Sequence, residues 1–362
     1  MRFTILVLSL FIAPLARTQK IAGGPMAVNV TEQTATVVWL VESSEVNLVS
    51  ADGVRSAPAY RVEKTTFTDL KPNMRYDYNI NGQESGQGHF KTAPAAGASE
   101  YNFVLYGDTR TRHDVHRRVI AQVLKQGVPD FIVNSGDQTE DGRNPRLWSI
   151  FFDAERELLR QAAIYPSLGN HERNARNYHD FFQAEMPYYS FNWGNAHFSV
   201  INSDIGNVGT SRVEKDEFWT RQTKWLEEDL KSHQNQSFRF VVAHHPPVTA
   251  VARRQGDNKH MQDLVPMLEQ YKVTAALFGH DHNYQHYLRN GIHYVVSGGG
   301  GAPLYDVDLP PAGITQKVEK VENFIAVRVS GQVAHFRSIS IEGAVVEQFD
   351  VRGTPPVSRI VR

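Results

Sequence analysis

The sequence predicts an α/β domain in which layered β-sheets are flanked by helices, preceded by a small all-β unit. From residue 100 onward, short apolar runs alternate with longer segments of helical periodicity, which is typical of an α/β layered domain. Residues 21–92 differ, because residues 34–41 are apolar and rich in β-branched side chains and a turn signal follows at Asn81-Gly82. We therefore expect a small β-sandwich followed by a larger, layered β-sandwich with helices on its faces.

The chain divides into four predicted segments. Residues 1–20 are a targeting segment, 21–92 the first β unit, 93–99 a linker and 100–362 the larger domain. The linker is predicted because its residues are small and show no periodicity. Residues 324–351 return to strand patterns, and we assign them to the larger domain.

Local patterns predict several elements of the larger domain. The segment around Trp225, Leu226 and Leu230 has the periodicity of an amphipathic surface helix. Residues 188–202 are expected to form a hairpin that turns at residues 192–195. Asn290-Gly291 lies between two strand-like runs and is a strong signal for a two-residue hairpin.

Composition excludes several classes of function. Of the 362 residues, 38 are Lys or Arg and 39 are Asp or Glu, so the formal net charge is −1. This balance argues against a nucleic-acid or membrane-surface binder, which usually carries a basic excess. There are no cysteines, which removes thiolate nucleophiles, iron–sulfur clusters and Cys-type zinc sites. Any metal must therefore be held by His, Asp, Glu or Asn.

The amino terminus has the pattern of an export signal. Arg2 supplies the positive charge, residues 5–13 are apolar, and Ala16 offers a cleavage point. A buried amino-terminal strand is the alternative. The apolar stretch is too short to span a bilayer, so no stable membrane insertion is expected once the signal is removed. Export without cysteines favours a secreted or periplasmic protein of a bacterial envelope.

Five times in the larger domain, a short apolar run ends in a polar cluster. A buried strand followed by a tight turn projects side chains into the crevice at the carboxyl edge of a sheet, where α/β proteins place their sites. One such cluster is weak evidence of a site, but five that use only oxygen and nitrogen ligands are difficult to explain as loops. The clusters are Gly107-Asp108-Thr109-Arg110, Gly136-Asp137, Gly169-Asn170-His171-Glu172, His244-His245-Pro246-Pro247 and Gly279-His280-Asp281-His282.

The donor types in these clusters predict a metal site. They include carboxylates, an amide oxygen and three or four imidazoles. Zn, Mn and Fe accept this mixture, whereas Ca and Mg favour oxygen alone. The donors suffice for two ions sharing one carboxylate. Two ions roughly 3.5–4 Å apart can activate a bridging hydroxide and bind the oxygens of an in-line displacement at phosphorus.

The order of the five clusters resembles that of the calcineurin-like metallophosphoesterase superfamily. Residues 68–78 resemble a fibronectin type III domain, with Leu70, Tyr76 and Trp39 as expected core residues. Together with this front unit, the clusters resemble the purple-acid-phosphatase branch. The resemblance covers roughly residues 21–305 and implies a catalytic domain of metallophosphoesterase fold.

The resemblance implies a role for each candidate residue. His171 would protonate the leaving oxygen or orient phosphate rather than bind metal. Two ions, with Fe, Zn or Mn as the candidates, would be bound by the remaining residues. Asp108 and His282 would bind the first ion, Asp137 would bridge both, and the second ion would be bound by Asn170, His244 and His280.

Two positions depart from the pattern of the resembled family. The purple enzymes have a Tyr three residues after the bridging Asp, where this chain has Glu140, so we expect a colourless or weakly coloured protein. Glu140 is either a further carboxylate ligand or a solvated loop residue. Many members have a His two residues after the first Asp, where this chain has Arg110. Arg110 either binds phosphate through its planar fork or pairs with a carboxylate such as Asp114 or Glu140.

The sequence thus predicts a dinuclear-metal phosphoester hydrolase in which a metal-bridging hydroxide attacks phosphorus, His171 assists the leaving group and Arg110 stabilises charge. Its partner is a small phosphoester, most simply a monoester, and no nucleic acid is expected. The same ligands would serve a phosphodiesterase or a nucleotidase. A non-catalytic, metal-containing envelope protein is the alternative of another class.

Other polar residues near the clusters are expected to be structural. His113 and His116 are predicted on the solvated face of an opening helix. His245 is expected to pack or to form hydrogen bonds behind the ligands rather than bind metal. His260 could reach the substrate, but its loop gives no further signal. Residues 298–301 are all glycine and are interpreted as a flexible strand end, although they could also permit close backbone approach.

Overall fold

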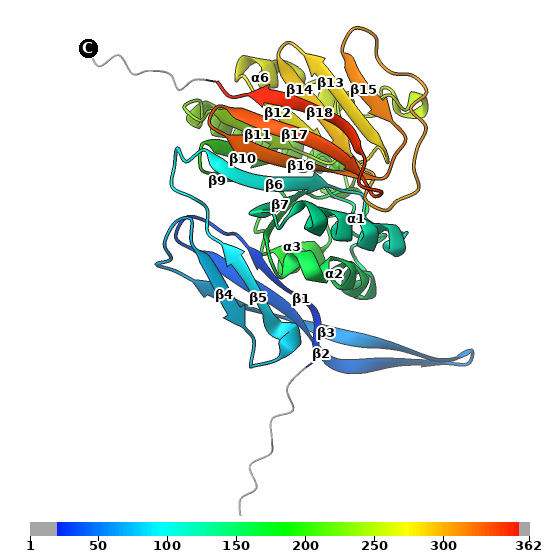
Figure 1. The fold of residues 1–362 in the computed structure, drawn as a ribbon. Helices are drawn as coiled ribbons and strands as arrows, with labels where there is room; N and C mark the ends of the chain where they lie inside the picture. The colour runs from blue at the N-terminus through cyan, green and yellow to red at the C-terminus, as the bar shows by residue number, and fades with distance from the viewer. Residues whose placement is uncertain (1–19, 355–362) are drawn as a thin grey trace, which may run out of the picture.

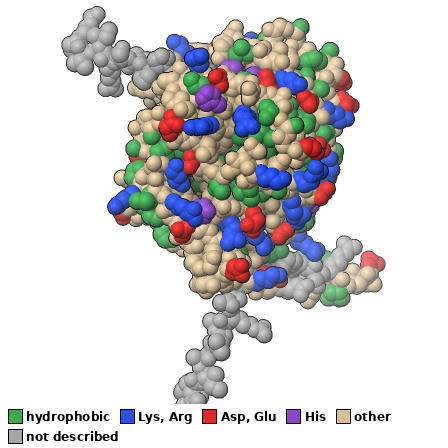
Figure 2. Space-filling model, viewed as in Figure 1, with side chains coloured by type: hydrophobic (Ala, Val, Ile, Leu, Met, Phe, Trp, Pro, Cys, Tyr) green, Lys and Arg blue, Asp and Glu red, His purple; other side chains and the backbone are tan. Residues whose placement is uncertain are grey.

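The computed structural model describes residues 20–354. The predicted export signal falls on residues 1–20, almost all of which lie outside the described residues. Within the described part of the chain, no helix is long and apolar enough to cross a membrane. Charged side chains of both signs are interspersed over the face drawn in Figure 2, in keeping with the near-zero net charge.

The first unit consists of two antiparallel sheets. One sheet has the order β1-β2-β3 and the other pairs β4 with β5. Trp39, Leu70 and Tyr76, which were expected in the core, pack against it but are only partly buried. The long β2–β3 hairpin extends away from the body of the molecule (Figure 1). The strands are β1 Ile21–Val28, β2 Ala35–Ser50, β3 Gly53–Phe67, β4 Arg75–Asn79 and β5 Gln87–Lys91.

Two larger sheets form the second part of the fold. The six-stranded sheet has the order β18-β17-β16-β6-β7-β8, and the seven-stranded sheet the order β15-β13-β14-β12-β11-β10-β9. The strands of the first are β6 Glu100–Tyr106, β7 Phe131–Asn134, β8 Ala163–Pro166, β16 Asn323–Ser330, β17 Val333–Ser340 and β18 Val345–Arg352. The strands of the second are β9 Tyr189–Trp193, β10 Ala196–Val200, β11 Phe238–Val242, β12 Ala275–Phe278, β13 Tyr284–Arg289, β14 Ile292–Ser297 and β15 Thr315–Glu319.

The two sheets pack face to face. Phe103 of β6 contacts Phe198 of β10 and Phe240 of β11 edge-on, with ring centroids 5.5 and 6.0 Å apart. These residues belong to one fully buried apolar cluster that draws side chains from both sheets. The layered β-sandwich predicted from the sequence is therefore present, and burial of this interface is its main source of stability.

Helices cover the outer faces of the sandwich. The apolar sides of α1, α2 and α3 pack in a second cluster with the six-stranded sheet, and α4, α5 and α6 pack in a third cluster on the seven-stranded sheet. Figure 1 shows α2 and α3 between the blue first unit and the strands of the six-stranded sheet. The helices are α1 His113–Gln126, α2 Pro145–Leu159, α3 Arg176–Phe182, α4 Arg212–Ser232, α5 Lys259–Gln262 and α6 Val265–Gln270.

Several local predictions are confirmed. The helix predicted around Trp225 is α4, which begins with a capping box formed by Ser211 and Glu214. Asn290-Gly291 joins β13 to β14, with Arg289 paired to Ile292. The hairpin predicted over residues 188–202 consists of β9 and β10. The solvated face predicted for α1 is wrong for His116, which is fully buried on a carboxylate of α2.

Candidate metal centre

The predicted ligands follow the carboxyl ends of five strands. β6, β7 and β8 run parallel in the six-stranded sheet, so the loops after them emerge at the same edge. In the seven-stranded sheet, β11 and β12 are also parallel. A hydrogen bond links the two sets of loops. The backbone N–H of His280, in the loop after β12, donates to Oδ2 of Asp108, in the loop after β6, at 2.8 Å. The structure therefore brings both sets of predicted ligands to one site.

Three of the predicted ligands have a backbone conformation that L-residues rarely adopt. Asp108, Asp137 and His280 have φ values of 58°, 56° and 69°. Such left-handed residues cost free energy and persist where the surrounding structure imposes them, which is common at functional sites. Gly169 shows how tight the loops are, because a Cβ there would overlap the side chain and backbone nitrogen of Asp137.

Asp108 and His282 form the first part of the centre. Asp108 is fully buried, and its Oδ1 has no hydrogen-bond partner and lies 3.4 Å from His282 Nε2. His282 donates its Nδ1–H to the carbonyl of Pro303 at 2.7 Å. This bond leaves the lone pair on Nε2, facing Asp108. Both atoms are thus oriented as metal ligands would be.

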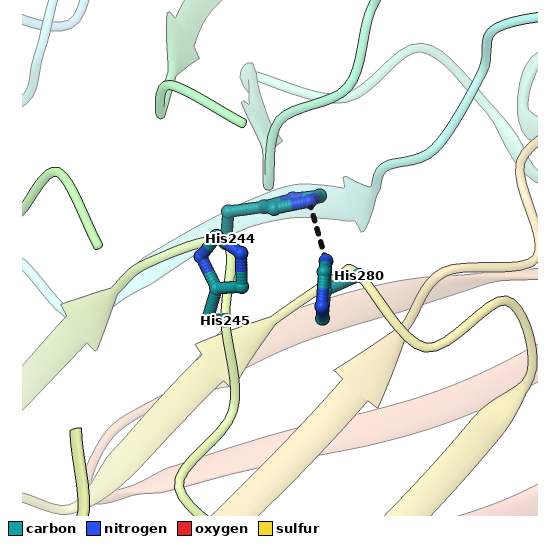
Figure 3. Close-up of side chains that lie close together, drawn as sticks. All are labelled: His244, His245 and His280. Atoms are coloured by element: carbon teal, nitrogen blue, oxygen red, sulfur yellow. Dashed lines mark hydrogen bonds between the residues drawn. The ribbon is translucent and has the colours of Figure 1, made fainter. Parts of the chain in front are cut away.

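Asp137, His244 and His280 form the second part. His244 donates Nδ1–H to the carbonyl of Ser135 at 2.8 Å, and its Nε2 lies 3.3 Å from Asp137 Oδ1. Nδ1 of His280 lies 3.2 Å from His244 Nε2, the contact dashed in Figure 3. Asp108, Asp137 and His244 place ligand atoms within 4.8 Å of one another, and so do His244, His245 and His280.

Asn170 completes the predicted set. Its Oδ1 is buried without a hydrogen-bond partner. Leaving a buried hydrogen-bond acceptor without a partner costs free energy, and Oδ1 of Asp108 is in the same situation. Two orphaned oxygens, together with imidazole nitrogens fixed by backbone carbonyls, fit divalent metal ions well. The donor set of this centre thus fits the dinuclear site expected from the sequence.

His171 lies beside the centre with its ring fixed. Its Nδ1–H donates to the carbonyl of Glu140 at 2.8 Å, and its Nε2 lies 3.9 Å from Asp137 Oδ2. Its backbone N–H donates to Asp137 Oδ1 at 3.0 Å. The side chain is 22% exposed, so the ring is partly open to solvent beside the centre.

Arg110 makes ion pairs with two carboxylates. Its Nε lies 3.4 Å from Asp137 Oδ2, and its Nη1 donates to Glu140 Oε2 at 2.8 Å. Thr111 donates to the same Glu140 oxygen at 2.9 Å. The pairing of Arg110 with Glu140, one of the two alternatives from the sequence, is therefore present. Glu140 is half exposed, and its Oε2 accepts hydrogen bonds from both Arg110 and Thr111.

Sequence reasoning assigned no role to three residues that support the centre. Buried Glu172 accepts hydrogen bonds from the backbone N–H groups of Asp137, Thr139 and Gly169, at 2.8, 3.2 and 2.8 Å, and so ties two ligand loops together. The position of Glu172 directly after His171, inside the third polar cluster, could have identified it as a residue of the site. Tyr305 stacks on His282 with centroids 4.0 Å apart.

Arg254 is the third of these residues, and it lies on the opposite side of His280 from His244. Its Nη1 contacts His280 Nε2, and its Nη2 donates to the Tyr305 hydroxyl at 3.2 Å. Arg254 ends the short 3-10 helix η3 (Ala252–Arg254) and Tyr305 lies in an irregular loop, and neither segment is long enough for periodicity to mark a position.

Burial and neighbouring charges shift the pKa values of several groups at the centre. Burial raises the pKa of Asp137, but His244, His171 and Arg110 outweigh it and hold that pKa well below its usual range. Burial lowers the pKa of His244, yet the carboxylates of Asp137 and Asp108 raise it to about 9. Burial, together with the charge of Asp137, raises the pKa of Glu172 to about 8. Without metal, the centre therefore retains protons that bound cations would displace.

The remaining residues singled out in the sequence have structural contacts. His245 hydrogen-bonds Ser203 Oγ through Nδ1 at 2.8 Å, as expected of a residue behind the ligands. His260 bonds the Ser203 carbonyl at 2.9 Å and packs edge-on against Trp219. The flexible strand end proposed for residues 298–301 is wrong. This stretch is buried, and Gly300 N–H donates to the Gly107 carbonyl at 3.1 Å, so the glycines permit close backbone approach.

The sequence model of the calcineurin-like phosphoesterase family matches residues 101–284, which contain all the predicted ligands. The chain belongs to this family. Human tartrate-resistant acid phosphatase type 5 is similar to this chain, with 27% identity over 224 residues, covering 52% of this chain and 66% of the human protein. The chain thus spans just under two thirds of that relative's length. The recognition made from the five clusters is confirmed.

Solved structures show the same fold. Purple acid phosphatase PPD1 from yellow lupin seeds superposes with a TM-score of 0.72 at 17% identity, covering 92% of this chain and 75% of the lupin chain. PhoD superposes with a TM-score of 0.65 at 11% identity, covering 96% of this chain and 95% of PhoD. At these identities the likeness is one of fold, and it confirms the predicted fold class.

Proposed function

We propose that this calcineurin-like phosphoesterase is a dinuclear-metal phosphoester hydrolase that acts on small phosphomonoesters. The proposal is supported by the convergence of Asp108, Asp137, His244, His280 and His282 beside the fixed imidazole of His171. The buried oxygens of Asp108 and Asn170 that lack a hydrogen-bond partner add to this support. Asp108 and His282 would hold one ion, Asn170, His244 and His280 the other, and Asp137 would bridge them. Fe, Zn and Mn suit this donor set.

The protein's own residues supply positioning and proton transfer. When bound, the two ions supply Lewis-acid polarisation of the phosphoryl oxygens and lower the pKa of water. The bond from His171 Nδ1–H to the Glu140 carbonyl fixes the ring, so that a proton on Nε2 is held toward the leaving oxygen. The guanidinium of Arg110 lies beside Asp137 and offers N–H donors to a phosphoryl oxygen as charge develops.

Metal analysis of the purified full chain, joined to a panel of phosphomonoesters and phosphodiesters, tests this proposal. We expect hydrolysis of monoesters that is lost on chelation. His171→Ala should retain the metal content of the wild type while turnover falls by about 10²–10⁴-fold. His280→Ala should lose both metal and activity. Loss of metal in His171→Ala would refute the assigned roles, and full activity with unchanged metal in His280→Ala would refute the dinuclear centre.

Export is part of the proposal. The basic start and apolar stretch of residues 1–20 support a secreted or periplasmic location in a bacterial envelope. Expression of the full sequence in a bacterial host, followed by fractionation and amino-terminal sequencing, tests it. We expect a mature protein outside the cytoplasm that begins near residue 17. Retention of Met1 in the cytoplasmic fraction would contradict it.

A further inference from the structure

A cleft beside the predicted metal centre has no part in the mechanism described so far. It has a volume of about 540 Å³ and lies between the loop that follows β11 and the loop that precedes β15. Pro246 and Pro247 are buried at its base, whereas Leu309 on its wall is 51% exposed. The cleft therefore opens to solvent above a buried base, and its volume is in the range of sites that bind small organic groups.

Hydrogen bonds between the two loops hold the walls of the cleft together. The backbone N–H of Leu309 donates to the Ala250 carbonyl at 2.9 Å. The backbone N–H of Ala252 donates to Asp308 Oδ1, and the side chain of Gln255 donates to the Leu309 carbonyl, each also at 2.9 Å. Because these bonds exist without a ligand, little conformational entropy would be lost when one binds. The cleft is therefore preformed.

Two contacts join this cleft to the predicted metal centre. Arg254 lines the cleft, and its Nη1 contacts Nε2 of the predicted ligand His280. Thr249 also lines the cleft, and its hydroxyl donates to Oδ2 of Asp281, the residue directly after His280. The cleft and the metal centre therefore share a boundary, which Arg254 and Thr249 form.

The lining of the cleft is mostly apolar. Pro247, Leu309 and Pro311 contribute hydrocarbon surface, and the amide side chain of Gln262 is polar but uncharged. Of the described residues that line the cleft, only Arg254 is charged, and it lies at the boundary with the centre. Apolar surface is bound favourably by such a lining, whereas a charged group deeper in the cleft would lose hydration without gaining an opposite charge. The lining therefore suits an uncharged, apolar group.

We propose that this cleft binds the leaving group of the phosphoester and selects a leaving group that is uncharged and carries a ring. The inference rests on the proposed function, because the phosphate must lie at the metal centre for its leaving group to pass Arg254 into the cleft. The ring then packs against Leu309 and Pro311. Contacts with a part of the substrate remote from phosphorus supply binding energy that raises kcat/KM. The cleft is thus a specificity site rather than a catalytic one.

Two phosphomonoesters that differ only in a terminal ring test the proposal. Phenylpropyl phosphate and propyl phosphate have leaving groups of similar acidity, and we expect the wild type to prefer the ring-bearing ester by at least about 10-fold in kcat/KM. Ala312→Trp fills the cleft and should abolish this preference, and Leu309→Ala should reduce it by about 3-fold or more. Both residues are exposed, so the fold should tolerate these changes. Leu48→Ala, at a leucine that is 67% exposed and outside the cleft, should keep the wild-type preference.

Phosphonates separate this inference from the proposed function, because their P–C bond is not hydrolysed and binding is measured without turnover. Calorimetry on the metal-loaded full chain should show phenylbutylphosphonate binding at least about 10-fold more tightly than butylphosphonate, with the difference lost in Ala312→Trp. That result without hydrolysis of any ester would refute the proposed function and leave the specificity site standing. Equal dissociation constants for the two phosphonates, no binding of either, or an unchanged difference in Ala312→Trp would overturn the specificity site, even in a protein that hydrolyses monoesters.

Discussion

Arg110 is held by carboxylates at the position where it would have to meet phosphate. Its Nη1 bond to Glu140 and its contact with Asp137 compete with a substrate oxygen for the same guanidinium. The two alternatives drawn from the sequence, phosphate binding and carboxylate pairing, therefore become two states of one residue. A partly exposed ion pair is worth about 0–1 kcal/mol, so an arriving phosphate can displace Glu140.

Inhibition by inorganic phosphate distinguishes these states. Glu140→Gln frees Nη1 and should lower the inhibition constant of phosphate by up to about 5-fold, the equivalent of 1 kcal/mol. Arg110→Met removes the donors and should raise that constant by at least about 10-fold, because hydrogen bonds to charged groups are worth about 1.5–3 kcal/mol. Arg143→Met, on an exposed pair with Asp141, should change nothing. If the inhibition constant of phosphate is unchanged in Arg110→Met, Arg110 does not bind phosphate and only forms ion pairs with the two carboxylates.

At the residue scale, the sequence shows which side chains are candidate metal ligands, but it does not show which residues contact one another in the fold. The ligands are recognisable because each follows a short apolar strand, and all but His244 also follow a glycine at the end of that strand. The left-handed backbone of Asp108, Asp137 and His280 is not foreseeable, because the surrounding loops impose it on residues that rarely adopt it. Arg254 was missed for a similar reason, since only the folded chain brings its loop against His280.

At the scale of elements, a buried polar triad joins two helices to β6, the strand that precedes Asp108. Glu155 of α2 accepts from Tyr106 at the end of β6 and bonds His116 of α1, each at 2.8 Å. All three side chains are fully buried. His116 was predicted on a solvated face because Arg112, Arg117 and Arg118 flank it in the sequence. The sequence does not show that α2 covers this side of the helix.

Replacing His116 should destabilise the protein, although this residue does not contact any of the predicted metal ligands. His116→Leu leaves the Glu155 carboxylate buried without its imidazole partner, which should lower the free energy of unfolding by about 3–5 kcal/mol. His113→Gln, one helical turn earlier and partly exposed, should change it by less than about 0.5 kcal/mol. Urea unfolding followed by circular dichroism measures both. Equal values for the two variants would show that the triad contributes no stability.

Elements that depend on local signals were predicted, whereas pairings between distant segments were not. The helix α4 and the hairpins β9–β10 and β13–β14 follow from periodicity and turn residues. The antiparallel pairing of β16 with β6 joins segments more than 200 residues apart. No local pattern specifies such a neighbour, because the choice is made by packing of the whole sandwich.

At the scale of the whole molecule, the first β unit shares its core with the larger domain. Met26 and Leu40 lie in the same buried cluster as Phe152 and Trp148 of α2. The hydroxyl of Tyr165 also donates to the Val30 carbonyl at 2.6 Å. The boundaries proposed from the sequence, 21–92 and 100–362, stay a prediction. Composition marks a linker but does not show how much apolar surface its two neighbours bury against each other.

In the metal-free protein, the protons bound by His244 and Glu172 make the stability of the whole chain depend on pH. The carboxylates of Asp137 and Asp108 outweigh burial and raise the pKa of His244 from its usual 6.5 to about 9 in the metal-free fold. A raised pKa stabilises the fold fully below pH 6.5, and this contribution is lost as the pH rises through 9. The pKa of Glu172, raised by burial to about 8, acts in the same direction.

We therefore expect the metal-free protein to lose up to about 3 kcal/mol of stability through His244 between pH 6.5 and 9. Asp137 adds no slope in this range, because its lowered pKa leaves it charged throughout. In the metal-loaded protein a cation replaces the proton on His244, so the increase in thermal midpoint on metal loading should grow with pH. Thermal unfolding of both forms at several pH values measures this, with metal-free His244→Asn, which should show a flatter profile, as the control. A metal-free wild type whose stability is constant or rises across this range would contradict the expected proton binding.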